Sequence, residues 1–100
     1  MTAQHPTPEE TARNIRIGWH ATRNLAKVIA SGRIDPTRLS EVYLFTTEAS
    51  AASYAREFGY EGIVTVEYKS NHVAACWKPK YAHGGTVIRL KRGRSAKVIK

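Results

Sequence analysis

Apolar and polar residues alternate in several short segments of this chain, and turn-forming residues separate these segments. An alternation with a period of two residues is typical of a strand that buries one face. In the first segment, Ile15, Ile17 and Trp19 alternate with three more polar positions. We therefore expect strands over residues 15–20, 41–46, 63–68, 73–77 and 86–91, and these limit the chain to folds built around a sheet.

Two other segments have the spacing of amphipathic helices. We expect one helix over residues 23–31, capped by Thr22, and another over residues 48–58, each followed by a glycine that ends it. The order strand, helix, strand, helix and then three strands indicates an α+β domain with a small mixed or antiparallel sheet and two short helices. The residues expected to be buried are Leu25, Val28 and Ile29 on the first helix, and Ala51, Tyr54, Ala55 and Phe58 on the second.

The length of 100 residues suits one domain, which we expect over residues 15–92. Residues 1–14 are expected to be an N-terminal arm with a short helical turn, because Thr7-Pro8-Glu9-Glu10 has the form of a capping box. Residues 93–100 are expected to be a basic C-terminal tail. The N-terminal residues lack the pattern of a secretion signal, and no apolar run is long enough to cross a membrane, so we expect a cytoplasmic protein.

Positive charge is segregated along the chain. The 16 basic residues outnumber the 8 acidic ones, yet residues 1–68 contain seven basic residues and all eight acids. The rest of the chain has nine basic residues and no acid, interleaved with aromatic residues, which indicates an anionic partner such as nucleic acid or a nucleoprotein. The residues expected to contact it are Lys69, Lys78, Lys80, Arg89, Lys91, Arg92, Arg94 and Lys97.

The cysteine and histidine residues do not suggest a metal site. Cys76 is the one cysteine, so the chain has no internal disulfide, and its place in the apolar run Val73–Trp77 predicts a buried side chain. The four histidines lack the spacing of metal ligands, and we expect no bound metal.

Three side chains stand out on the expected strands: His20, Tyr43 and Glu67. Taken singly, each is typical of an ordinary strand. A histidine at the end of a strand is mostly solvated, and a tyrosine on a strand mostly packs against its neighbours. A glutamate on an edge strand mostly keeps the protein soluble. Periodicity alone does not say whether the fold brings the three together.

Five motifs follow one another over residues 15–68. They are Trp19-His20-Ala21-Thr22, a helix with Val28, Ile29, Gly32 and Ile34, Val42-Tyr43-Leu44-Phe45-Thr46, Ala51-Ala52-Ser53-Tyr54-Ala55, and Gly62-Ile63-Val64-Thr65-Val66-Glu67. In this order they resemble the ADP-ribosyltransferase superfamily, with a looser match over residues 86–92. The similarity is to small bacterial or phage members such as rifamycin ADP-ribosyltransferases, and to RNA 2′-phosphotransferases.

The resemblance implies a split, twisted sheet that clamps NAD. It assigns His20 to the hydroxyls of the adenosine ribose, Thr22 to the same ribose or its phosphates, and Tyr43 to stacking on nicotinamide. The activity it implies is transfer of ADP-ribose from NAD to a macromolecular or small-molecule acceptor. Such enzymes carry their catalytic acid late in the chain, and Glu67 is the last acid here, so the resemblance assigns catalysis to Glu67 with Tyr43.

Two alternatives stay open at the level of sequence. In the first, the fold has lost its chemistry and acts as a basic binding module or inhibitor on nucleic acid or a nucleoprotein, as a phage anti-defence protein would. In the second, the chain is an RNA 2′-phosphotransferase, which relies on a histidine and several arginines. Candidates for those arginines are Arg16, Arg23, Arg56 and Arg89.

Overall fold

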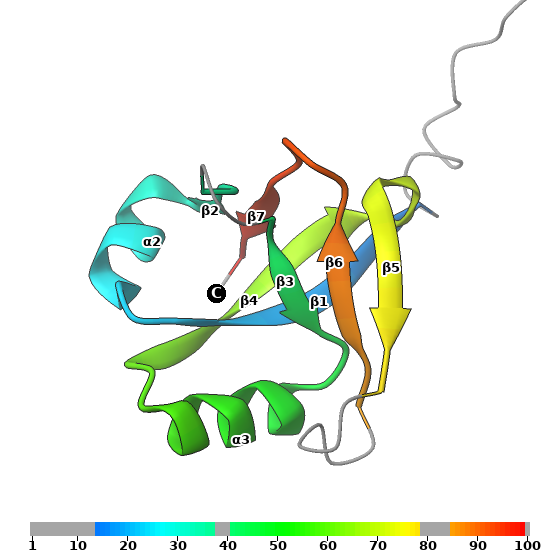
Figure 1. The fold of residues 1–100 in the computed structure, drawn as a ribbon. Coiled ribbons are helices and arrows are strands. Elements are labelled where there is room, and N and C mark those ends of the chain that lie inside the picture. The colour runs from blue at the N-terminus through cyan, green and yellow to red at the C-terminus, as the bar shows by residue number, and fades with distance from the viewer. Residues whose placement is uncertain (1–13, 38–40, 79–84, 100) are drawn as a thin grey trace, which may run out of the picture.

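The computed structural model describes residues 14–37, 41–78 and 85–99. The expected arm up to residue 13, and residues 79–84 of the expected loop before the last predicted strand, lie outside the described residues. The described chain folds into seven strands and two α-helices, so the α+β class is confirmed (Figure 1). The elements are β1 (Ile15–Thr22), α2 (Leu25–Ser31), β2 (Arg33–Ile34), β3 (Tyr43–Phe45), α3 (Glu48–Phe58), β4 (Gly62–Lys69), the 3₁₀ turn η1 (Ser70–His72), β5 (Val73–Trp77), β6 (Val87–Leu90) and β7 (Ala96–Val98).

All seven strands form one sheet in the order β2-β7-β4-β1-β3-β6-β5, and every neighbouring pair is antiparallel. β1 pairs with β4 along its whole length, from Ile15↔Lys69 to Thr22↔Gly62. In contrast, β1 and β3 share one registered pair, Trp19↔Phe45. The β2-β7-β4-β1 half and the β3-β6-β5 half diverge from this pair, and their strands run in different directions (Figure 1).

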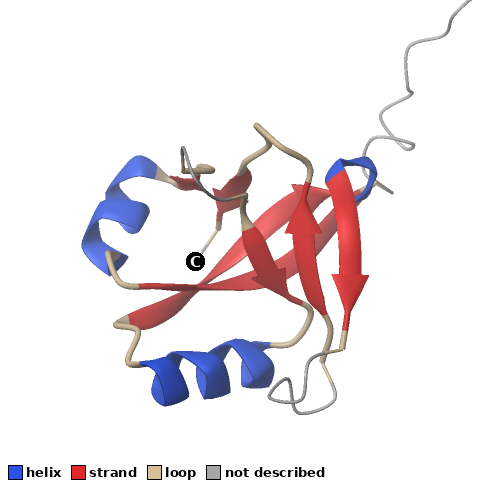
Figure 2. Cartoon of the chain, viewed as in Figure 1, coloured by secondary structure: helices blue, strands red, loops and turns tan. Residues whose placement is uncertain are grey.

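The sheet buries side chains on both faces, because successive residues of a strand point to opposite sides. One core contains the fully buried Leu44 and Leu90, and α2 packs against it. The other core contains Phe45, Val87 and Ala51 of α3. Leu44 and Phe45 are neighbours on β3 and point to opposite faces, and both are buried because α3 covers the face of Phe45. Figure 2 shows α2 beside β2 and α3 along the other side of the molecule.

α3 has the bounds that the sequence predicts, because both of its ends carry local signals. Thr47 caps the first turn, and its Oγ1 accepts a hydrogen bond from the backbone N–H of Ser50 at 3.2 Å. At the other end Gly59 adopts φ of 70°, a left-handed conformation that favours glycine, and donates its N–H to the carbonyl oxygen of Ala55.

α2 is shorter than the sequence predicts. The helix begins at Leu25 with Asn24 as the N-cap residue, whereas we expected it to begin at residue 23. Thr22 does not cap the helix, because its Oγ1 accepts the backbone N–H of Asn24 at 3.0 Å within the turn that leads into it. The expected burial of Ile29 is wrong, since it is 57% exposed, and so is that of Phe58 on α3, which is 47% exposed. Leu25 and Val28 pack against the first core.

The C-terminal residues form part of the sheet, and the expected basic tail over residues 93–100 is wrong. β7 is inserted between β2 and β4, where Lys97 pairs with Arg33 on one side and Glu67 on the other. Ala96 is only 2% exposed, and the N–H of Val98 donates to the carbonyl oxygen of Gly32 at 2.8 Å. The domain therefore extends past residue 92, the boundary that the sequence suggested.

β5 has the bounds that the sequence predicts, but its side chains are more exposed than expected. Among the described strands, β5 lies at the edge of the sheet and pairs with β6 alone. The side chain of Cys76 is exposed there, so its predicted burial is wrong.

Among the helices of the described residues, none combines the length and the apolar character that crossing a membrane requires.

Candidate functional site

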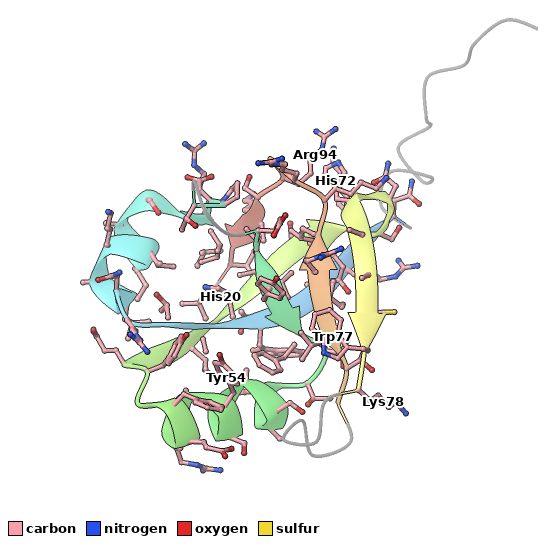
Figure 3. All side chains as sticks on the ribbon, in the orientation of Figure 1. His20, Tyr54, His72, Trp77, Lys78 and Arg94 are labelled. Carbon is pink, nitrogen blue, oxygen red and sulfur yellow. The ribbon has the colours of Figure 1, made fainter. Side chains whose placement is uncertain are left out.

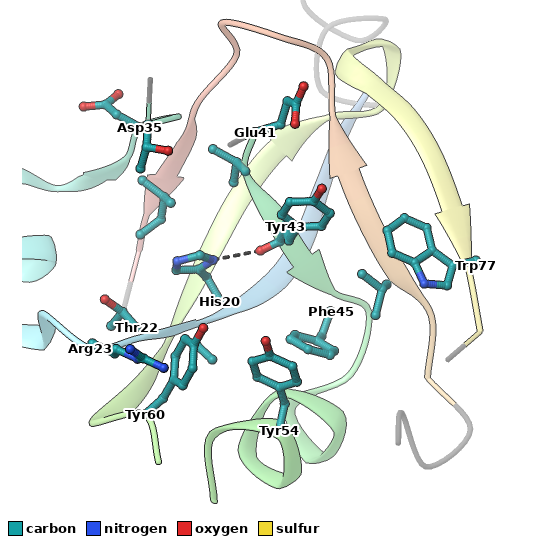
Figure 4. A pocket seen from close by; sticks show the side chains of 15 residues that line it. His20, Thr22, Arg23, Asp35, Glu41, Tyr43, Phe45, Tyr54, Tyr60 and Trp77 are labelled. Carbon is teal, nitrogen blue, oxygen red and sulfur yellow. Dashed lines mark hydrogen bonds between the residues drawn. The ribbon is translucent and has the colours of Figure 1, made fainter. Parts of the chain in front are cut away.

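A cavity of about 420 Å³ opens where β1 and β3 diverge. Its wall comes from segments far apart in the sequence: the end of β1, the start of β3, α3 and the end of β5 (Figure 4). A concave site with an apolar wall and a few polar groups is the usual form of a small-molecule site.

His20 lies at the point of divergence. Its Nδ1 is 2.8 Å from the backbone oxygen of Tyr43, so this side chain links β1 and β3 just beyond their registered pair (Figure 4). A carbonyl oxygen only accepts hydrogen bonds, and Nδ1 therefore carries a proton. Burial lowers the pKa of His20 from its ordinary value of 6.5, and the bond to Tyr43 offsets part of this shift. The imidazole is neutral at neutral pH, and its Nε2 is a hydrogen-bond acceptor.

Aromatic rings form most of the apolar wall. Tyr43 and Trp77 meet edge to face with ring centroids 6.1 Å apart. Tyr54 of α3 lies 5.2 Å from the ring of Phe45 and 5.2 Å from that of Tyr60, measured between centroids. All five rings line the cavity. Rings of this kind offer flat apolar surfaces on which a planar ligand stacks.

A cation and a hydroxyl stand at the β1 end of the cavity. The guanidinium carbon of Arg23 lies 4.7 Å from the centre of the Tyr60 ring, a cation–π contact that holds the charge beside the aromatic wall. Thr22 is only 6% exposed, and its oxygen already accepts the N–H of Asn24. Arg23 is therefore the stronger candidate for a ligand phosphate.

Two carboxylates, Asp35 and Glu41, lie on the opposite rim (Figure 4). Asp35 forms an ion pair with Arg33, in which Nε and Oδ2 are 2.9 Å apart. The cavity thus presents a cation at one end and carboxylates at the other, with His20 between them.

The structure brings together three of the four residues that the sequence singled out for NAD. His20, Thr22 and Tyr43 line the same cavity, although their roles toward a ligand stay predictions. Glu67 does not join them. It pairs with Ile17 across β1, whereas His20 pairs with Val64, and residues at odd and even spacing on a strand point to opposite faces. The expected place of Glu67 in this site is therefore wrong.

The basic residues of the C-terminal third do not all lie on one surface. Lys78 follows the end of β5, far along the strand from His72 and Arg94 (Figure 3). Arg89 lies on β6 opposite Tyr43, and Lys69, Lys91, Arg92 and Arg94 lie in or beside the turns that bound β5 and β6 at the other end. Lys80 lies outside the described residues.

No ligand role was predicted for Tyr54, Tyr60 and Trp77, or for the carboxylates Asp35 and Glu41. Arg23 was predicted as one of four candidate arginines for RNA 2′-phosphotransfer, and it directly follows the motif that carries His20 and Thr22. Tyr54 was expected as a core residue of its helix, and it contacts the second core as well as the cavity. Nothing in the spacing of Tyr60 and Trp77 links them to His20.

The described residues include no group of three or more His, Cys, Asp or Glu side chains arranged to hold a metal ion. The cavity is thus built from rings, one neutral imidazole, one guanidinium and two carboxylates. No protein-family model matches this chain, and no curated protein and no solved structure matches it.

Proposed function

We propose that the cavity between β1 and β3 binds NAD or a related nucleotide, as the resemblance to the ADP-ribosyltransferase superfamily implies. The observation that carries the proposal is the meeting of His20, Arg23 and a row of aromatic rings in one cavity. These groups suit the parts of a dinucleotide: flat rings for a base, a guanidinium for the diphosphate and an acceptor for a ribose hydroxyl.

In this proposal each residue has a distinct role. Tyr43, which is 38% exposed, offers its ring for stacking on nicotinamide. His20 accepts a ribose hydroxyl proton at Nε2, because Nδ1 already donates to Tyr43. Arg23 holds a phosphate oxygen while its guanidinium rests on Tyr60.

Calorimetric titration with NAD and with ADP-ribose tests this binding. We expect His20→Ala and Tyr43→Ala to abolish the heat of binding, and Tyr43→Phe to retain it, because the ring is kept. The matched control is His72→Ala, which removes a histidine outside the cavity. Binding that survives the double substitution of His20 and Tyr43 by Ala contradicts the assignment of the site.

ADP-ribosyl transfer is the activity that we propose for the bound NAD. In such a reaction the bond between nicotinamide and ribose breaks, and a carboxylate stabilises the positive charge that develops on the ribose. With Glu67 on the other face, the proposal gives this role to Glu41, which lines the cavity two residues before Tyr43. We expect Glu41→Gln to stop the release of nicotinamide while NAD still binds. Glu57→Gln on the exposed side of α3 is the control, and release that continues in Glu41→Gln contradicts the role.

RNA 2′-phosphotransfer is the second candidate function. It is favoured because a histidine, His20, and an arginine, Arg23, line the same cavity. That activity relies on a histidine and arginines rather than on a carboxylate in the family that the chain resembles. Incubation with a 2′-phosphorylated RNA, with and without NAD, separates the two activities. Release of the 2′-phosphate only in the presence of NAD supports this candidate over ADP-ribosyl transfer to another acceptor.

A further inference from the structure

Within the described residues, the face of the sheet that carries Glu67 is only half covered. α3 packs over the part that contains Trp19 and Ile63, and it leaves the other part open. Ile15 and Ile17 of β1 lie on this open part and are 37% and 45% exposed. A partner that covers both would gain apolar contact.

The strand register places a row of charged residues beside these isoleucines. Arg33 of β2 pairs with Lys97 of β7, Lys97 pairs with Glu67 of β4, and Glu67 pairs with Ile17 of β1. Lys69, two residues beyond Glu67, pairs with Ile15 and shares the same face. Three cations from three strands therefore share one face of the sheet with the carboxylate of Glu67, although they are far apart in sequence. Arg33 also forms its ion pair with Asp35.

The same surface is hollowed. A second cavity of about 440 Å³ is lined by Arg33, Glu67, Lys69, His72 and Lys97, and it shares no lining residue with the cavity around His20. The concave shape lets several cations approach one ligand from different sides.

The turns next to this hollow add further positive charge. The N–H of Lys91 donates to the carbonyl oxygen of His72 at 2.7 Å, and the N–H of Arg94 donates to that of Lys91 at 3.0 Å, so the two turns are joined (Figure 3). Burial lowers the pKa of His72, and the charges of Arg94, Lys69 and Lys91 lower it further. These three cations thus lie close enough to act on one imidazole.

We propose that this open basic face, formed by Arg33, Lys69 and Lys97 and extended by Lys91 and Arg94, binds the sugar-phosphate backbone of a single-stranded nucleic acid. Phosphates spaced along a strand match cations spaced along a hollow. A single strand fits better than a duplex, because its unpaired bases are free to cover the exposed Ile15 and Ile17. Lys78 and Arg89, at the β5–β6 edge, are not part of this face.

Glu67 should weaken the binding of nucleic acid to this face. It is the one carboxylate that lines the hollow within the described residues, and it lies between Lys97 and Ile17 in the strand register. Its negative charge opposes the approach of a phosphate. We therefore expect Glu67→Gln to strengthen binding of nucleic acid, a result that a purely structural role of Glu67 does not produce.

The proposal is tested by measuring the affinity for labelled oligo(dT) and oligo(U) by fluorescence anisotropy at a series of salt concentrations. We expect the affinity to fall steeply as the salt concentration rises. The double variant Lys69→Gln with Lys97→Gln should reduce the slope of log K against log salt by about 0.7 for each phosphate that is no longer neutralised. The matched control is Lys27→Gln with Arg56→Gln, which removes the same charge from exposed positions on the two helices. Thermal unfolding of each variant establishes that the fold is retained.

Three outcomes overturn the proposal. One is an equal loss of affinity in the paired variant and in its control, since net charge alone would then explain binding. Another is unchanged or weaker binding in Glu67→Gln. The third is binding to poly-glutamate or to vesicles of anionic lipid with no binding to either oligonucleotide, because the partner would then belong to another class.

Discussion

His20 shows how one residue ties the fold to the proposed chemistry. Its Nδ1 fixes the backbone of Tyr43 where β1 and β3 diverge, and this bond leaves Nε2 as the acceptor for a ligand. The sequence could place His20 at the end of one strand and Tyr43 within the next, because alternation and short motifs are local. It could not show that Glu67 faces the other way, since this depends on the register between β1 and β4.

The protonation of His20 gives a prediction about pH. The pKa of His20 is lowered in the folded protein, so the unfolded chain binds a proton more readily than the folded chain does. The contribution of neutral His20 to stability is therefore complete above the ordinary pKa of 6.5, and it is lost as the pH falls below that value. We expect the free energy of unfolding, measured with urea, to decrease on this acid side, and to decrease less in His20→Asn, which can keep the bond to Tyr43. His72→Asn should also lessen the acid-side decrease, because the pKa of His72 is lowered as well, so each histidine is replaced separately to measure its own share. NAD affinity should fall as the pH drops through the lowered pKa of His20 in the folded protein, because a protonated Nε2 no longer accepts a hydrogen bond. Affinity that stays constant until the protein unfolds in acid contradicts the role of Nε2.

At the scale of elements, the sequence predicted best those that carry their own signals. α3 has Thr47 and Gly59 at its ends, and β5 is a continuous apolar run, so both have the predicted bounds. β2 and β7 were missed, because each has only two or three residues and no alternation long enough to recognise. β2 pairs with β7, and β7 pairs with both β2 and β4. These strands form only because the sheet brings distant segments together.

The role of β7 can be tested by one substitution. Ala96 is 2% exposed and pairs with Ile34 in the first core, so Ala96→Asp would bury an unpaired charge. We expect a loss of about 3 kcal/mol or more in the free energy of unfolding. Ser95→Asp, at the exposed neighbouring position, should cost far less. If the two variants unfold alike in urea, residues 93–100 behave as the basic tail that the sequence suggested.

For the whole molecule, the net charge of +8 predicted an anionic partner but not where that partner binds. The segment without acids divides between the β5–β6 edge and the β7 side of the sheet. Both parts contribute residues to a cavity, but only the second contributes cations to one, and there they are joined by Arg33 from the nearly neutral first part of the chain. A charge count along the sequence reports how much charge a segment carries, whereas strand pairing decides which charges meet.

The two cavities predict two independent binding events. They share no lining residue, and His20 and Glu67 mark opposite faces of the β1–β4 pair. Charges in water are screened over about 8 Å at physiological salt, so phosphates bound on one face should have little effect on a nucleotide bound at the other. Coupling between two sites ordinarily changes an affinity by about fivefold or more. We expect saturation with oligo(dT) to change the NAD dissociation constant by less than this. Calorimetric titration of NAD with and without the oligonucleotide measures this change. Strict competition between the two ligands would instead mean that the nucleic acid enters the His20 cavity, because two ligands exclude each other completely only where they occupy the same space.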